Sequence, residues 1–70
     1  MHKHSLFMPS IDKGNIALDW ILANQDGIED WDFSSSGTVL NFYTAFPLTE
    51  QQKHVIVSTV EPISFLSEEL

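Results

Sequence analysis

The residues best suited to recognition are acidic and lie close together, four within a stretch of seven positions: Asp26, Glu29, Asp30 and Asp32. The 70-residue chain carries ten acidic residues against three lysines, for a formal charge of −7. A negative patch can steer and pair with a basic protein surface. Because a helix dipole disfavours negative charge at its C-terminal end, the local structure does not explain Asp26. We therefore expect these four residues to bind a basic partner, with Glu50, Glu68 or Glu69 as outer members.

The same acids have a plainer interpretation, in which they form only the solvated side of a strand and the end of a helix. A net charge away from zero keeps a small protein soluble without any partner. The chain would then be an accessory or assembly subunit that dimerises through its sheet. Acids gathered on one face favour recognition, whereas acids scattered around the surface favour solubility.

A calcium site is the competing use of the acidic stretch. An EF-hand loop needs oxygen ligands at positions 1, 3 and 5, a glycine at 6 and a glutamate at 12. Counted from Asp30, the chain supplies Asp32 and Ser34 but has Ser35 in place of the glycine and Asn41 in place of the glutamate. The pattern fails at both diagnostic positions, so we expect no calcium there.

Histidines are the other candidate ligands and the only candidate catalytic bases. His2 and His4 would lie on one side of an extended strand, and His54 stands alone. A third ligand is missing, so we expect neither a metal nor another cofactor. The serines at 34–36 precede a glycine as in an ordinary turn and lack a nucleophile-elbow pattern. We therefore expect no enzyme.

Composition indicates one folded domain covering residues 1–70. The chain is 43% hydrophobic and 11% aromatic, unlike disordered chains. A core of this size supplies only about 3 to 5 kcal/mol, and cysteine is absent, so disulfides cannot reinforce it. We therefore expect a homodimer or a standing partner.

The charge also restricts the class of partner. Binding to nucleic acid or anionic membrane depends on lysine and arginine, which are scarce here, so we expect no direct nucleic-acid or membrane contact. No apolar run approaches a membrane span and no signal-peptide core is visible, which favours the cytoplasm. The expected partner is a basic protein, such as a nuclease or a nucleic-acid-binding complex. Acidic immunity proteins and phage anti-defence proteins inhibit such targets in this general way, a likeness of charge and size only.

The first half of the chain predicts a strand and then a helix. His4 to Pro9 is a short apolar run closed by proline, which favours a strand at the edge of a sheet. Apolar residues at helical spacing then follow Asp12, and Gly27 stands where a glycine often ends a helix. The pattern predicts a helix from about Lys13 to Asp26.

A hairpin should follow. Trp31 and Phe33 alternate with Asp30 and Asp32, which predicts a half-buried strand with both aromatic side chains in the core. Trp20 is expected in the core as well. After the serine and glycine turn, the stretch 38–46 alternates again, with Leu40, Phe42 and Thr44 on one face and Val39, Asn41 and Tyr43 on the other.

The last third predicts a single helical turn and a strand. Thr49 and Gln52 have capping-box spacing, which indicates one turn over Thr49 to Lys53. The β-branched run at 54–60 favours a last strand, and residues 63–70 favour a short helix or a docked tail. The expected fold is a small two-layer α+β domain with one main helix on a three- or four-stranded, mainly antiparallel sheet, in β-α-β-β-β order. This order resembles a ferredoxin-like plan with a shortened second helix, which implies no function.

Overall fold

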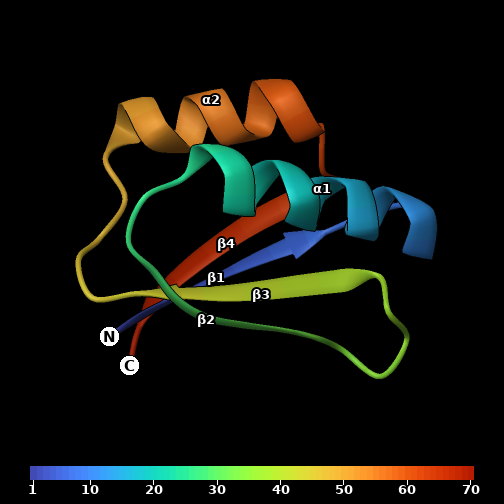
Figure 1. The fold of residues 1–70 in the computed structure, drawn as a ribbon, viewed down its shortest axis with the longest axis horizontal. Coiled ribbons are helices and arrows are strands. Elements are labelled where there is room, and N and C mark those ends of the chain that lie inside the picture. The colour runs from blue at the N-terminus through green and yellow to red at the C-terminus, as the bar shows by residue number, and fades with distance from the viewer.

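The computed structural model describes all 70 residues as a helical layer on a sheet. The four strands form one antiparallel sheet in the order β2-β3-β1-β4, and both helices lie on the same face (Figure 1). The predicted small two-layer α+β class is confirmed. The β-α-β-β-α-β order is that of the ferredoxin-like arrangement. In chain order the elements are β1 (His2–Phe7), α1 (Ile11–Asn24), β2 (Ile28–Phe33), β3 (Val39–Thr44), α2 (Glu50–Val60) and β4 (Ser64–Glu69).

Helix α1 forms near the predicted position, but its N-cap is Ser10. The Ser10 Oγ accepts a hydrogen bond from the Lys13 backbone N–H at 3.2 Å and so satisfies a free donor of the first turn. The helix therefore begins at Ile11, two residues before the predicted start at Lys13, and it ends at Asn24, two residues before the predicted end at Asp26. The small and aliphatic residues on one side of α1 are buried: Gly14, Ala17, Leu18 and Ile21.

The β2–β3 hairpin is confirmed, with one error concerning Trp31. Leu40, Phe42 and Thr44 share one face of β3, as predicted, and the structure shows that this face is the buried one. Trp31 lies beside Phe42 in the register, yet 42% of its surface is exposed. The expectation that Trp31 fills the core is wrong because β2 is an edge strand and Trp31 projects beyond the cover of the helices.

Strand β1 is central, which corrects its expected place at an edge. It pairs with β3 on one side and with β4 on the other. Pro9 lacks a backbone N–H, but it lies beyond Phe7, the last residue of the strand, so it interrupts neither ladder. Pro9 therefore follows the end of β1 and does not determine whether the strand is central or at an edge.

Residues 54–60, predicted as a strand, are the second half of helix α2. The capping box predicted at Thr49 is present: its Oγ accepts from the Gln52 N–H, and the Gln52 side chain accepts from the Thr49 N–H at 2.8 Å. The helix continues because Ile56 and Val60, four residues apart, both face the core. That packing outweighs the weak strand preference of β-branched residues.

Residues 63–70, expected as a short helix or a docked tail, contain strand β4. It pairs with β1 in an unbroken register from Ser64 to Glu69. Because residues 50–60 form helix α2, the fourth strand of the sheet is formed by the segment that follows it. The β-α-β-β-β order is thereby corrected to two helices and four strands.

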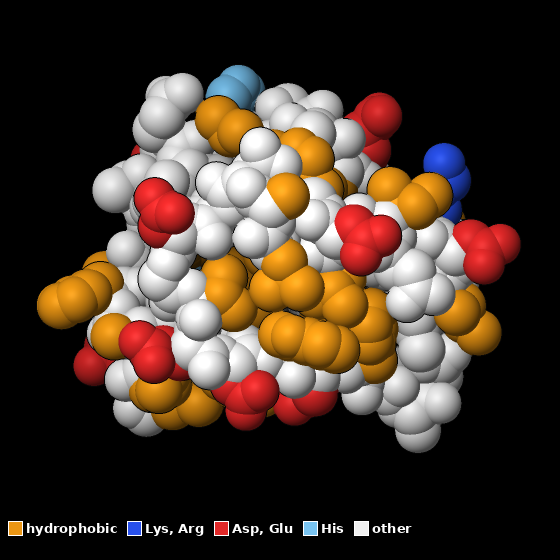
Figure 2. Space-filling view, viewed as in Figure 1, with side chains coloured by type: hydrophobic (Ala, Val, Ile, Leu, Met, Phe, Trp, Pro, Cys, Tyr) orange, Lys and Arg blue, Asp and Glu red, His pale blue; other side chains and the backbone are white.

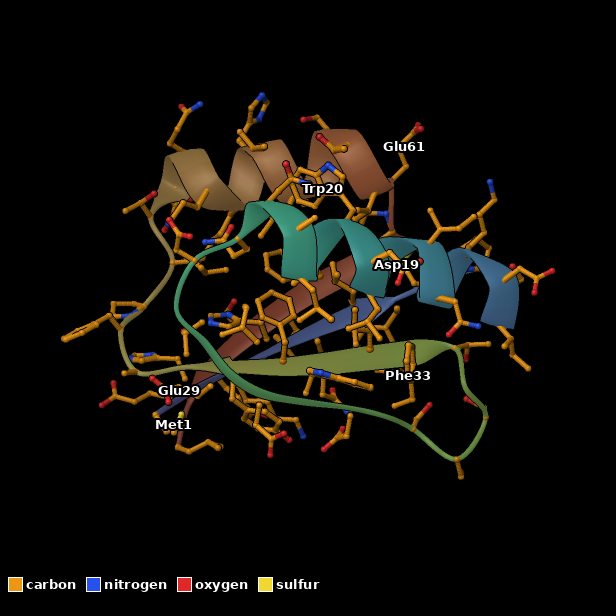
Figure 3. All side chains as sticks on the ribbon, in the orientation of Figure 1. Met1, Asp19, Trp20, Glu29, Phe33 and Glu61 are labelled. Carbon is orange, nitrogen blue, oxygen red and sulfur yellow. The ribbon has the colours of Figure 1, made fainter.

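The core lies between the sheet and the helices. Its largest fully buried side chains come from β1, β3, α1 and α2, and Trp20 packs between the two helices (Figure 3). Phe33 fills the space beside Gly14, where an added Cβ would meet the ring at 3.3 Å. Neither helix is long and apolar enough to cross a membrane.

Candidate functional site

One face of the sheet carries no helix, and we call it the open face. Side chains on successive residues of a strand point to opposite faces, so the register assigns every second residue to this side. Figure 1 shows both helices on the opposite side of the strands. The open face consists of Asp30 and Asp32 from β2, Val39, Asn41 and Tyr43 from β3, Lys3, Ser5 and Phe7 from β1, and Ser64, Leu66 and Glu68 from β4.

The structure divides the four clustered acids between two surfaces. Asp30 and Asp32 lie on the open face, opposite Tyr43 and Asn41 in the register. Asp26 lies in the loop after α1, and Glu29 occupies the irregular position between Ile28 and Asp30. The closely spaced acids therefore do not form one continuous patch.

Asp26 and Glu29 line a hollow of about 290 Å³ at one end of the sheet. The segment from Ala45 to Leu48 forms its other wall together with Gln52, and the Phe46 side chain is 81% exposed beside it. No buried side-chain nitrogen or oxygen lacks a hydrogen-bond partner anywhere in the protein. This end of the sheet combines acids with an aromatic ring, but it contains no buried polar side-chain atom without a hydrogen-bond partner.

A chain of hydrogen bonds crosses the open face and fixes the Asp32 carboxylate. Ser5 Oγ donates to Asn41 Oδ1 at 2.7 Å, and Asn41 Nδ2 donates to Asp32 Oδ1 at 2.9 Å. The Tyr43 hydroxyl donates to Asp32 Oδ2 at 3.3 Å. Both carboxylate oxygens of Asp32 are thus held in place by neighbouring side chains from β3. A carboxylate held in this way loses little freedom when it pairs with a cation.

The environment of Tyr43 keeps its hydroxyl protonated as a donor. Burial, the negative charge of Asp32 and the hydrogen bond to Asp32 raise the pKa of Tyr43 above its ordinary value, with smaller effects from Asp30 and Glu68. Asp32, Asp30 and Glu68 all raise the pKa of the same hydroxyl group, that of Tyr43. The open face is therefore negative around Tyr43.

Little positive charge balances these acids. The one ion pair in the structure joins Lys53 Nζ and Glu50 Oε1 on α2, at 3.8 Å. Lys3 is the single cation of the open face. It lies between Tyr43 and Glu68 in the register and forms no ion pair with Glu68 or with any other acid. Charges that remain unpaired on the surface are available to a partner.

Apolar side chains lie beside the acids on the β4 side. Phe7 and Leu66 belong to neighbouring strands of the open face, and Ile63 stands just before β4. All three are exposed. Figure 2 shows that acidic side chains are spread over the visible surface, with apolar groups between them. The ten acids are therefore distributed over several surfaces, which favours solubility for most of them, but three of them, Asp30, Asp32 and Glu68, share the open face with Phe7 and Leu66.

The histidines do not assemble a metal site. His4 is 1% exposed, and both of its ring nitrogens are bonded, Nδ1 to Ser67 Oγ at 2.7 Å and Nε2 to Thr44 Oγ1 at 2.9 Å. Thr44 donates its own proton to the Phe46 carbonyl, so its oxygen accepts from His4 Nε2–H, and Nδ1 accepts from Ser67. Burial, with His2 and Lys53 nearby, lowers the pKa of His4 to about 4. The ring is a neutral core residue.

The remaining candidates from the sequence are not brought together with His4. His54 is exposed on α2, and no group of three or more histidine, aspartate or glutamate side chains is arranged to hold a metal ion. Ser34 and Ser36 hydrogen-bond to each other in the turn between β2 and β3, at 2.9 Å. The turn lies beyond the pair Phe33 and Leu40, whereas His4 pairs with Phe42 and bonds only to Ser67 and Thr44 through its ring.

Several open-face residues were not singled out as recognition residues on the basis of the sequence. The alternation predicts that Asn41 and Tyr43 share a face of their strand, but nothing in the sequence indicates that they hold Asp32. Glu68 was named only as an outer member, because residues 63–70 were not recognised as a strand. Ile63, Ser64 and Phe65 alternate, but Leu66 and the polar residues after it break the pattern, so no clear signal in the sequence could have placed Glu68 on the open face.

Comparison with known proteins returns no match to a protein-family model, to a curated protein or to a solved structure.

Proposed function

We propose that the protein is a non-enzymatic protein-binding module that engages a basic protein through the open face of its sheet. The observation that carries the proposal is the composition of this uncovered face. It presents three acids against one lysine, with exposed Phe7 and Leu66 beside them. A face that joins charge to apolar area suits a protein partner, because the apolar groups supply affinity and the charges supply steering.

The hydrogen-bonded network supports the proposal through preorganisation. Asp32 is fixed by Asn41 and Tyr43, so a lysine or arginine that reaches it meets an acceptor already in position. Asp30 and Glu68 flank this network from the two edge strands. In this proposal Asp30 and Asp32 carry recognition, and Asp26 and Glu29 serve solubility or a peripheral contact.

An inhibitory role follows from the chemistry of the expected partner. A basic surface on a nuclease or a nucleic-acid-binding protein normally faces phosphate. If the open face occupies that surface, nucleic acid is excluded from it. The protein would then sequester or inhibit its partner.

A second candidate is an assembly subunit that dimerises through its sheet. The exposed Phe7, Ile63 and Leu66 favour it, because monomers rarely leave contiguous apolar patches uncovered. In this function the acids serve solubility only. Sedimentation at micromolar concentration distinguishes the two, since the second candidate requires a stable dimer of this chain.

Charge removal at two matched places tests the proposed function. One variant carries Asp30→Asn and Glu68→Gln on the open face, and its control carries Asp26→Asn and Glu29→Gln at the end of the sheet. Both remove the same charge through the same two kinds of substitution. With the partner captured from a native lysate, the open-face variant should associate roughly tenfold more slowly at low salt, and the rate of the control should stay close to that of the unaltered protein.

Thermal unfolding provides the accompanying check. These acids are exposed and not ion-paired, so neither variant should lose stability. Equal association rates for both variants and the unaltered protein, across a range of salt concentrations, would contradict the proposed function and favour the assembly subunit.

A further inference from the structure

Strand β4 forms one free edge of the sheet, and its backbone groups there lack partners. The Leu70 N–H donates to the Met1 carbonyl at 2.9 Å. Because bonds to the neighbour alternate along an antiparallel strand, this contact directs the even-numbered residues of β4 toward β1. The N–H and C=O groups of Phe65, Ser67 and Glu69 consequently point outward. They offer a regular row of donors and acceptors.

The other edge of the sheet is protected, whereas the edge at β4 is not. Strand β2 has an irregularity in its pairing at Glu29 and carries Asp30 and Asp32, and both a bulge and charge discourage strand pairing. Strand β4 is regular over six residues, and Pro62 lies outside it. The β4 edge is therefore the one suited to accept a further strand.

The side chains of β4 differ between its two ends. At its start lie the exposed Ile63 and, on the open face, Leu66 next to Phe7. At its finish stand Glu68 and Glu69, which are exposed and not ion-paired. A complementary strand must carry basic residues at one end and apolar residues at the other.

We infer that the β4 edge accepts an extended segment of the basic partner as a fifth strand, antiparallel to β4, in which basic residues precede apolar ones. Antiparallel pairing is slightly more stable per residue than parallel pairing, and this direction brings the basic residues to Glu68 and Glu69. Main-chain bonds would supply affinity and the side chains specificity, as in other cases of strand addition. The inference rests on the proposed function and names the element of the partner that is recognised.

Charge complementarity selects such a segment over a second copy of this chain. Residues 63–70 contain no lysine or arginine, so pairing β4 with another β4 leaves Glu68 and Glu69 without cations. A basic segment supplies them. The two acids thus add nothing to self-pairing, whereas they strengthen pairing with a basic segment.

The test uses a fluorescent six-residue probe as long as β4, with two lysines followed by alternating valine and threonine. Two modified probes carry N-methyl groups on alternate residues, one set on each edge of the extended peptide. Composition and charge are the same in both. If the probe adds as a strand, one set will abolish binding and the other will leave it nearly intact, since only one edge faces β4. A probe with the order of residues reversed should bind several-fold more weakly.

Two protein variants locate the probe on β4. Glu69→Pro removes an outward donor without removing a bond to β1, and Glu69→Gln removes the charge alone. Circular dichroism establishes that both are folded. The proline variant should bind the probe several-fold more weakly than the glutamine variant.

Each opposite result overturns the inference. Equal binding of the two N-methylated probes means that charge alone holds them, and equal binding by the two variants places the probe elsewhere. If the protein forms a dimer and the probe dissociates it, a second copy of this chain, and not a segment of the partner, occupies the β4 edge. The inference also fails if the probe does not bind while the captured partner still depends on Asp30 and Glu68, and in that case the proposed function stands.

Discussion

Replacement of Ile56 with alanine should unfold a large fraction of the protein at room temperature. Ile56 is fully buried in the face of α2 that packs on the core. Truncating such a side chain costs about 2 to 5 kcal/mol. A core of this size supplies only about 3 to 5 kcal/mol in total. The two quantities are comparable, so the variant should lie close to its unfolding midpoint without denaturant.

The neighbouring Val57 provides the control. It lies one position away on α2 with 41% of its surface exposed, so Val57→Ala should change the free energy of unfolding by less than about 1 kcal/mol. Urea titrations followed by circular dichroism measure both variants. Similar losses at the two positions would contradict the packing of α2 on the sheet, because an amphipathic helix must distinguish its buried side from its exposed side.

Stability should fall steeply as the solution is acidified from pH 6.5 toward pH 4, because of His4. Its pKa is lowered from 6.5 to about 4 in the folded protein. Between these two pH values His4 is largely protonated in the unfolded chain and largely neutral in the folded protein. The free energy of unfolding therefore decreases with falling pH, by up to about 3 kcal/mol in total, and the His4 contribution levels off below the folded pKa.

A His4→Leu variant isolates this effect from the titration of carboxylates. Leucine fits beside Phe42 and Phe65 without a titratable group, and Thr44 keeps its bond to the Phe46 carbonyl. The difference between the stabilities of the unaltered protein and the variant should shrink or change sign between pH 7 and pH 4.5, as measured by urea unfolding. Parallel pH profiles for the two proteins would mean that His4 is not buried in its neutral form.

The sequence predicted the first helix and the central hairpin well because each is specified locally. Helical spacing before Gly27 and strict alternation after Val39 need no knowledge of the rest of the chain. The last third was misread because its local signals conflict. A capping box at Thr49 favours a helix, whereas the β-branched residues at 54–60 favour a strand, and only packing of Ile56 against the core decides between them.

The candidate site was predictable in part for the same reason. The alternation around Trp31 correctly placed Asp30 and Asp32 toward water, but spacing along the chain did not reveal that Asp26 and Glu29 turn to another surface. Asp26 lies in the loop before β2, and Glu29 occupies the irregular position just before Asp30. Glu68 joins Asp30 and Asp32 on the open face only through β4, a strand that the sequence pattern does not predict.

Mapping the binding site of the partner by the chemical shifts of the backbone amides tests the central claim most directly. Amide chemical shifts of the isotopically labelled protein are recorded before and after addition of the captured partner. Binding through the open face predicts the largest changes at residues of the open face and β4, including Lys3, Tyr43, Leu66 and Glu68, with small changes along the exposed sides of α1 and α2. Changes confined to the two helices, with the sheet residues unaffected, would contradict it.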